Sequence, residues 1–162
     1  MNIKCINLHS LKLKALLVSI AVPLLTGVLS NLLSGRIKPV YLSMEKPSFA
    51  PPPWVFPVVW SILFILMGIS CYLIYESVSP FRKKALYAYG TQLFLNMFWT
   101  LIFFRLGLYL FAAVWLGLIM TAALVTIIYF YKINKCAAYL QIPYMLWLVF
   151  ALLLNACVYF LN

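Results

Sequence analysis

The sequence has no aspartate, only two glutamates, Glu45 and Glu76, and a single histidine, His9. None of these three residues lies inside a long apolar run. General acid–base catalysis needs a titratable group within reach of the substrate, and proton-coupled transporters normally carry one within the membrane. The chain also lacks H-E-x-x-H, G-x-S-x-G and phosphate-loop motifs. These absences argue against ordinary enzyme chemistry and against proton-coupled transport.

The four cysteines show no metal-binding or disulfide pattern. They form no C-x-x-C pair, and Cys71 and Cys157 lie within apolar runs. Structural zinc sites use closely spaced cysteine and histidine ligands, which this chain lacks. We therefore expect neither a metal site nor disulfides.

Apolar side chains dominate the rest of the sequence. Of the 162 residues, 67% are hydrophobic, and the mean hydropathy is +1.06, whereas a soluble domain is only about half apolar. Apolar runs of about 20 residues without alternation predict membrane-spanning helices rather than a β-barrel. We expect an all-α polytopic membrane protein, a five-transmembrane-helix bundle that forms one domain over residues 1–162. The expected spans are residues 15–33, 54–75, 85–104, 108–131 and 137–161, with a long proline-rich loop at 34–53.

Basic residues account for the net charge of +10 and gather at the ends of the apolar runs. There they meet lipid headgroups, so the expected partner is a lipid bilayer and not a nucleic acid. Eight of the twelve basic residues fall on one side of the predicted bundle, which the positive-inside rule makes cytoplasmic. The N-terminus is therefore expected in the cytoplasm, with the long loop and the C-terminus outside. The eight are Lys4, Lys12, Lys14, Arg82, Lys83, Lys84, Lys132 and Lys135.

Aromatic and amide residues recur at helical spacing in three of the predicted spans. Trp147, Ala151 and Asn155 are each four residues apart, so they share one helix face. An amide such as that of Asn155 is costly in hydrocarbon unless something satisfies it. Two interpretations remain open: a hydrogen bond between helices, or the wall of a pocket for a flat, largely apolar ligand. The other faces are Phe56, Trp60, Phe64 and Met67, and Gln92, Asn96, Trp99 and Phe103.

Three motifs occur in order along the chain, at residues 46–60, 96–104 and 143–155. Together they resemble the TspO/MBR family, which includes the tryptophan-rich sensory proteins of bacteria and the mitochondrial translocator protein. The resemblance implies a five-helix bundle, usually a homodimer, that binds porphyrins such as protoporphyrin IX and haem. We expect a bacterial cell membrane as the location, and no intrinsic cofactor. The positions that match the family's pocket lining are Gly27, Trp60, Asn96, Trp99, Trp147, Ala151 and Asn155, and the aromatic face of the second span adds Phe56 and Phe64.

The chain departs from the family pattern at several aromatic positions. It has Val40 and Phe49 in the long loop where the family commonly has tryptophan, and Phe64 where many members have tyrosine. It also lacks the aromatic and arginine extension that is linked to cholesterol in animal members. Sterol binding is therefore not expected.

The function predicted on this basis is that of an integral membrane receptor or sensor for tetrapyrroles. Trp60 and Trp147 would stack on the macrocycle or meet its edge, because aromatic rings favour offset and edge-to-face contacts. Asn96 and Asn155 would form hydrogen bonds with its polar atoms. Basic residues of the long loop would attract its propionates: Arg36, Lys38 or Lys46.

Two alternatives belong to other functional classes. Some bacterial relatives are described as degrading protoporphyrin in light, with two pocket tryptophans as the redox-active groups, and Trp60 and Trp147 match those positions. In that case these two residues would be catalytic. The other alternative is porphyrin transport across the membrane, which the absence of coupling charges within the spans supports least.

Overall fold

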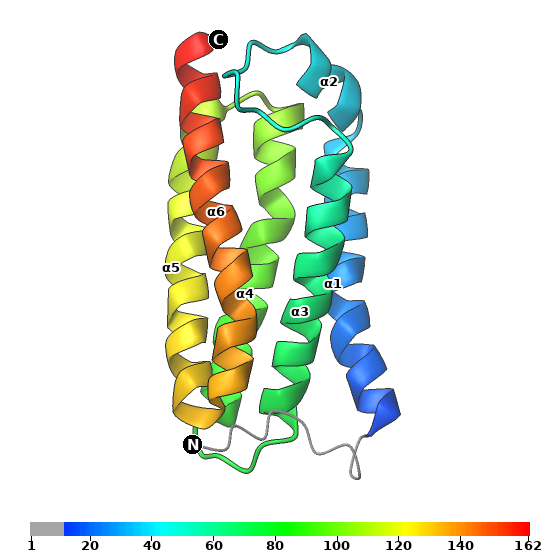
Figure 1. Cartoon of the computed structure of the whole chain (residues 1–162), viewed down its shortest axis with the longest axis vertical. Coiled ribbons are helices and arrows are strands. Elements are labelled where there is room, and N and C mark those ends of the chain that lie inside the picture. The colour runs from blue at the N-terminus through cyan, green and yellow to red at the C-terminus, as the bar shows by residue number, and fades with distance from the viewer. Residues whose placement is uncertain (1–11) are drawn as a thin grey trace.

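The computed structural model describes residues 12–162, which are helical apart from short connections (Figure 1). Lys4 and His9, which entered the sequence analysis, lie outside this range. No strand occurs among the described residues, so the expectation of an all-α protein is confirmed. The elements are α1 (Leu13–Ser34), α2 (Ile37–Ser43), α3 (Val55–Tyr75), α4 (Arg82–Thr100), the π-helix η2 (Leu101–Arg105), α5 (Tyr109–Ile133) and α6 (Lys135–Leu161).

Four of these helices, α1, α3, α5 and α6, are long and apolar enough to cross a membrane. Their bounds agree with four of the predicted spans to within two residues. The remaining predicted span, residues 85–104, corresponds to α4 and η2. Three basic residues at its start and several polar side chains make α4 less apolar than the other four. The four apolar helices identify the chain as an integral membrane protein.

The long helices form a closed ring around a common core. In the ring, α1 packs on α3, α3 on α6, α6 on α5, α5 on α4, and α4 back on α1. Figure 1 shows all five running along the long axis of the molecule, with α2 lying across one end of the bundle. The start of α1 and the end of α6 are at opposite ends of the bundle, because the number of long helices is odd.

Burial follows the pattern expected of a helical bundle in lipid. The core contains fully buried side chains from α3, α5 and α6, among them Met67, Leu116 and Tyr144. Large apolar side chains also cover the outer surface, where acyl chains would surround them. This outer apolar surface includes Leu17 and Leu32 of α1, Leu118 and Leu124 of α5, and Leu146 and Leu153 of α6.

The segment expected to be a loop, residues 34–53, contains a short helix. Residues Ile37–Ser43 form α2, a helix that the prediction of a long loop did not include. Pro39 does not disrupt this helix because it lies in the first turn, where backbone N–H groups have no partner within the helix. A single side chain of α2, Tyr41, is buried, and its packing against the bundle explains why so short a segment is helical.

The end of the predicted third span is a π-helix rather than a regular α-helix. In η2, the N–H of Leu106 bonds to the carbonyl of Leu101, five residues earlier. In the turn before η2, the Met97 carbonyl accepts a hydrogen bond from Ser30 Oγ of α1, at 2.8 Å. After η2 the chain turns at Gly107, whose φ of 64° lies in the region that favours glycine. The predicted spans leave residues 105–107 as this connection, whereas nothing in the sequence predicted the π-helix.

The expectation that the chain has no disulfides is wrong for Cys136, which is disulfide-bonded. This residue stands in the first turn of α6, at the end of the bundle, rather than within an apolar run. Cys71 and Cys157, which do lie within apolar helices, are free. In these three cysteines, the bonded residue lies at a helix end and the two free residues lie within apolar helices, a difference that the absence of a C-x-x-C motif does not show.

Candidate functional site

The nine predicted site residues line two adjacent spaces rather than one pocket, both near the end of the bundle that α2 covers. The larger, which we call the outer groove, has a volume of about 760 Å³ and opens to the outside between α1, α2, α3 and α4. The smaller, the inner hollow, has a volume of about 20 Å³ and lies between α2, α3, α4, η2 and α6. Of the predicted residues, Gly27, Phe64 and Asn96 line only the outer groove, Trp147, Ala151 and Asn155 only the inner hollow, and Phe56, Trp60 and Trp99 both.

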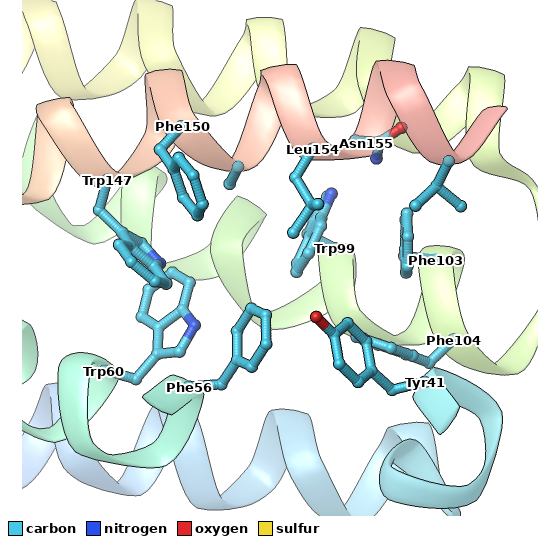
Figure 2. A pocket seen from close by; sticks show the side chains of 12 residues that line it. Tyr41, Phe56, Trp60, Trp99, Phe103, Phe104, Trp147, Phe150, Leu154 and Asn155 are labelled. Atoms are coloured by element: carbon cyan, nitrogen blue, oxygen red, sulfur yellow. The ribbon is translucent and has the colours of Figure 1, made fainter. Parts of the chain in front are cut away.

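Five aromatic side chains line both spaces and separate them: Tyr41, Phe56, Trp60, Trp99 and Phe104. We call the three that the sequence predicted, Phe56, Trp60 and Trp99, the aromatic partition. Figure 2 shows Trp60 and Phe56 of α3 on one side of the inner hollow, and Trp147, Phe150 and Leu154 of α6 on the other. The Phe56 and Trp147 rings meet edge to face, with centroids 6.1 Å apart. Only side-chain rings close off the hollow here, so movement of these rings would join it to the groove.

The π-helix brings two consecutive phenylalanines to the same site. Trp99 stacks on Phe103 at 5.2 Å and also meets the edge of Phe104 at 6.3 Å. In a regular α-helix, consecutive side chains point about 100° apart, so only one of the two phenylalanines would share the face of Trp99. The wider π-turn places both rings against the inner hollow. For this reason helical spacing in the sequence did not identify Phe104.

The amide of Asn155 is the least satisfied polar group of the site. Its side chain is 1% exposed, and neither its nitrogen nor its oxygen has a hydrogen-bond partner among the described residues. The indole Nε1 of Trp99, which also lines the inner hollow, is likewise buried without a partner. The alternative of a hydrogen bond between helices is therefore not observed for Asn155. Buried groups of this kind are normally paired, and both of these belong to residues that line the hollow.

Two other buried amides, Gln92 and Gln141, do hold helices together. Gln92 Nε2 of α4 donates to Gln141 Oε1 of α6 at 3.3 Å, and Gln141 Nε2 donates to Ser70 Oγ of α3 at 3.3 Å. All three side chains are fully buried. This chain of hydrogen bonds lies deeper in the bundle than the two spaces and lines neither of them. The bundle thus contains one amide network between helices and a separate amide, that of Asn155, without any protein partner.

Close contact between Gly27 and Phe64 forms one wall of the outer groove. A Cβ atom added to Gly27 would collide with the Phe64 ring, so only glycine allows this ring to lie against α1. Phe64 in turn contacts Trp60 of the aromatic partition, with ring centroids 5.3 Å apart. The glycine on α1 therefore supports the partition through Phe64.

The charges around the site are positive. Arg36 and Lys38 line the outer groove, and neither Glu45 nor Glu76 lines either space. Glu76 forms an ion pair with Lys12 at 2.9 Å at the opposite end of the bundle. Lys46, the third cation considered for propionates, donates instead to backbone carbonyls of Tyr41 and Met44. Among residues 12–162, no group of histidine, cysteine, aspartate or glutamate could hold a metal ion.

Tyr41 is the main residue that sequence reasoning missed. It comes from α2, is 4% exposed, and lines both spaces. Its hydroxyl donates to the Pro51 carbonyl at 2.6 Å, and its ring meets Phe56 edge to face at 5.1 Å. Burial raises the pKa of the Tyr41 hydroxyl. Its position in a segment expected to be a loop gave no periodicity that could have indicated a pocket.

These features define a class of protein: a helical integral membrane protein with a ligand-sized aromatic site that is positively charged at its mouth. Among the described residues that line this site, none is acidic and none could hold a metal ion. The chain belongs to the TspO/MBR family, whose family model matches residues 19–161. It is 37% identical over 122 residues to the tryptophan-rich protein TspO of Archaeoglobus fulgidus, covering 75% of this chain and 79% of that protein. It is 38% identical over 122 residues to the translocator protein of Homo sapiens, with 74% and 72% covered. The protein CrtK of Rhodobacter capsulatus is 33% identical over 129 residues, with 75% and 78% covered.

Proposed function

We propose that this protein is a membrane receptor or sensor that binds tetrapyrroles such as protoporphyrin IX and haem, and that it acts as a homodimer in a bacterial cell membrane. The observation that carries the proposal is the outer groove. Its volume of about 760 Å³ falls in the range of small-molecule sites, which is about 300–1,000 Å³. Its walls include the flat rings of the aromatic partition, which suit a flat macrocycle.

Charge and hydrogen bonding support the same class of ligand. A tetrapyrrole carries propionate groups at one edge, and Arg36 and Lys38 lie where the outer groove meets the long loop. Asn96, which is 6% exposed, lines the deeper part of the groove beside Trp99. Asn155 would be reached only after the aromatic partition moves. In this proposal the macrocycle occupies the groove, and the partition and the two amides contact its face and polar atoms.

The proposal also makes α4 the fifth transmembrane helix. Its 19 residues would be about 28 Å long, close to the hydrocarbon thickness of about 30 Å. It closes the ring between α1 and α5, so in a membrane it must lie at the same depth as those two helices. The polar side chains Gln92 and Asn96 face the interior rather than lipid, as expected of polar groups at membrane depth.

Titration of the purified protein with protoporphyrin IX, followed by the change in porphyrin absorbance, tests the proposal. Trp60→Leu removes a ring that lines both spaces and should weaken binding by about two- to tenfold. Trp115→Leu is the matched control, because the Trp115 indole donates to the Leu95 carbonyl and lines neither space. Equal affinity of the wild type and the Trp60 variant for porphyrin would contradict the proposed site.

Light-dependent degradation of porphyrin is the second candidate function, because Trp60 and Trp147 line the same inner hollow. Illumination of the complex should then bleach protoporphyrin IX faster than illumination of the free pigment. A Trp60→Phe, Trp147→Phe double variant keeps an aromatic ring at both positions and should lose the difference. Bleaching at the rate of free porphyrin in both proteins would leave binding as the function. Transport has less support, since the network of Gln92, Gln141 and Ser70 and the fully buried Tyr144 fill the bundle below the site.

A further inference from the structure

The segment that joins α2 to α3, residues 44–54, crosses the end of the bundle, and we call it the strap. In Figure 1 it runs from α2 towards the end of α6 and returns to α3. On its way it packs Phe49 against Phe150 of α6, with ring centroids 6.4 Å apart. The strap therefore covers the end of α6, whose residues Leu154 and Val158 line the inner hollow.

The side chain of Asn162, at the end of α6, holds the strap through hydrogen bonds to both backbone groups of Glu45. The N–H of Glu45 donates to Asn162 Oδ1 at 3.1 Å, and Asn162 Nδ2 donates to the Glu45 carbonyl at 3.0 Å. The same nitrogen also donates to the Val158 carbonyl at 3.0 Å, which holds the amide in place on α6. The carboxylate of Glu45 takes part in none of these bonds.

Hydrogen bonds within the strap connect this contact to the pocket. Lys46 Nζ donates to the Met44 carbonyl at 2.6 Å and to the Tyr41 carbonyl at 2.7 Å, so the residues on both sides of Glu45 are tied to α2. Tyr41 is tied to the far part of the strap through its bond to the Pro51 carbonyl. The strap, α2 and the Tyr41 ring are thus linked as one unit, and Asn162 joins that unit to α6.

We propose that Asn162 is a positioning residue for ligand exchange: its amide latches the strap to α6 and so controls how often Tyr41 uncovers the inner hollow. The choice of protoporphyrin IX as the ligand rests on the proposed function, whereas the latch itself rests only on the contacts above. Because entry and exit would both require the unlatched state, loss of the latch should raise both rates by a similar factor. The ratio of the two rates, and hence the affinity, should change little.

Hydrogen exchange of the full-length protein in lipid nanodiscs tests the latch without a ligand. Asn162→Ala removes the acceptor of the Glu45 N–H, and exchange at that amide should become about three- to tenfold faster. Glu45→Ala is a matched control, since it keeps both backbone groups and should leave exchange unchanged after correction for the intrinsic rate. Unchanged exchange in Asn162→Ala, or equally fast exchange in Glu45→Ala, would overturn the proposal.

Stopped-flow binding of protoporphyrin IX supplies the functional readout. In Asn162→Ala, the association and dissociation rate constants should both rise by about three- to tenfold. A lower melting temperature with unaltered rates would show that Asn162 only stabilises the fold, and would overturn the proposal. If wild-type protein fails to bind protoporphyrin IX, the proposed function is wrong, and the exchange experiment alone decides on the latch.

Discussion

Replacing Asn155 with leucine separates a ligand-binding amide from a structural one. Leucine keeps the branching of the side chain and removes both polar atoms, neither of which has a partner among the described residues. A buried polar atom left unpaired costs about 1–3 kcal/mol, so its removal should not destabilise the ligand-free protein. If Asn155 meets the ligand, the same change removes a hydrogen bond worth about 0.5–1.5 kcal/mol. Affinity for protoporphyrin IX should then fall by about two- to tenfold.

Gln141→Leu is the matched control for this experiment. The Gln141 amide accepts from Gln92 and donates to Ser70, and its loss would leave the Gln92 amide nitrogen buried without an acceptor. This variant should lose about 1–3 kcal/mol of unfolding free energy while the folded fraction keeps its affinity. The two substitutions therefore have opposite expected signatures, although both replace a buried amide in α6 with leucine.

The assay is a chemical denaturation curve for each ligand-free variant together with a porphyrin titration at a temperature where both are folded. Asn155→Leu should leave the denaturation midpoint unchanged or raise it, and weaken binding. A clear drop in the midpoint with affinity intact would refute the reasoning, because it would mean that Asn155 stabilises the fold through contacts absent from this structure.

Three further predictions concern the walls and the cover of the site. Ala151→Leu adds three carbons to the inner hollow, a space of about 20 Å³, and should weaken porphyrin binding by about tenfold. Unchanged affinity would show that the ligand stays in the outer groove. Gly27→Ala should weaken binding by pushing Phe64 into the groove, and Phe64→Leu in the same chain should restore it; independent effects of the two changes in a double-mutant cycle would contradict this contact. Because burial raises the pKa of Tyr41, its bond to Pro51 is fully present below about pH 10 and is lost as pH rises through the folded pKa. Porphyrin release should therefore accelerate as pH rises above about 10, and Tyr41→Phe should abolish that step.

The sequence predicted the helices well because hydropathy and charge mark their ends directly. Lysines flank the connection between α5 and α6, and the glycine at position 107 fixes the turn before α5. The helix faces were also predictable. Residues spaced by three or four positions, such as Trp147, Ala151 and Asn155, do line one space. In both cases the information is local in the chain, which is why composition and periodicity were sufficient.

The features that were not predicted all depend on contacts between distant segments. The seven residues of α2 are too few to show a helical period, and the burial of Tyr41 among α3 and η2 residues explains their conformation. The Met97 carbonyl, in the turn before the π-helix, accepts a hydrogen bond from Ser30, 67 residues away. Asn162 belongs to the same group, because its partner Glu45 is 117 residues distant in the chain.

The division of the site into two spaces has a consequence for how a ligand would be recognised. The rings that line the outer groove also close the inner hollow, so a ligand held in the groove presses on the same Phe56, Trp60 and Trp99 that hide Asn155. A small apolar ligand would occupy the groove without exposing the Asn155 amide. Such a ligand forms no hydrogen bond with that amide, so it gains nothing that offsets the free-energy cost of moving the three packed rings. A ligand with its own hydrogen-bonding atoms would gain from reaching Asn155 and the Trp99 indole, and that gain offsets the cost of moving the partition. The rings and the basic residues at the mouth would attract many flat anions alike. Discrimination between those ligands would then come from hydrogen bonds to the unpaired polar atoms of Asn155 and Trp99 behind the rings.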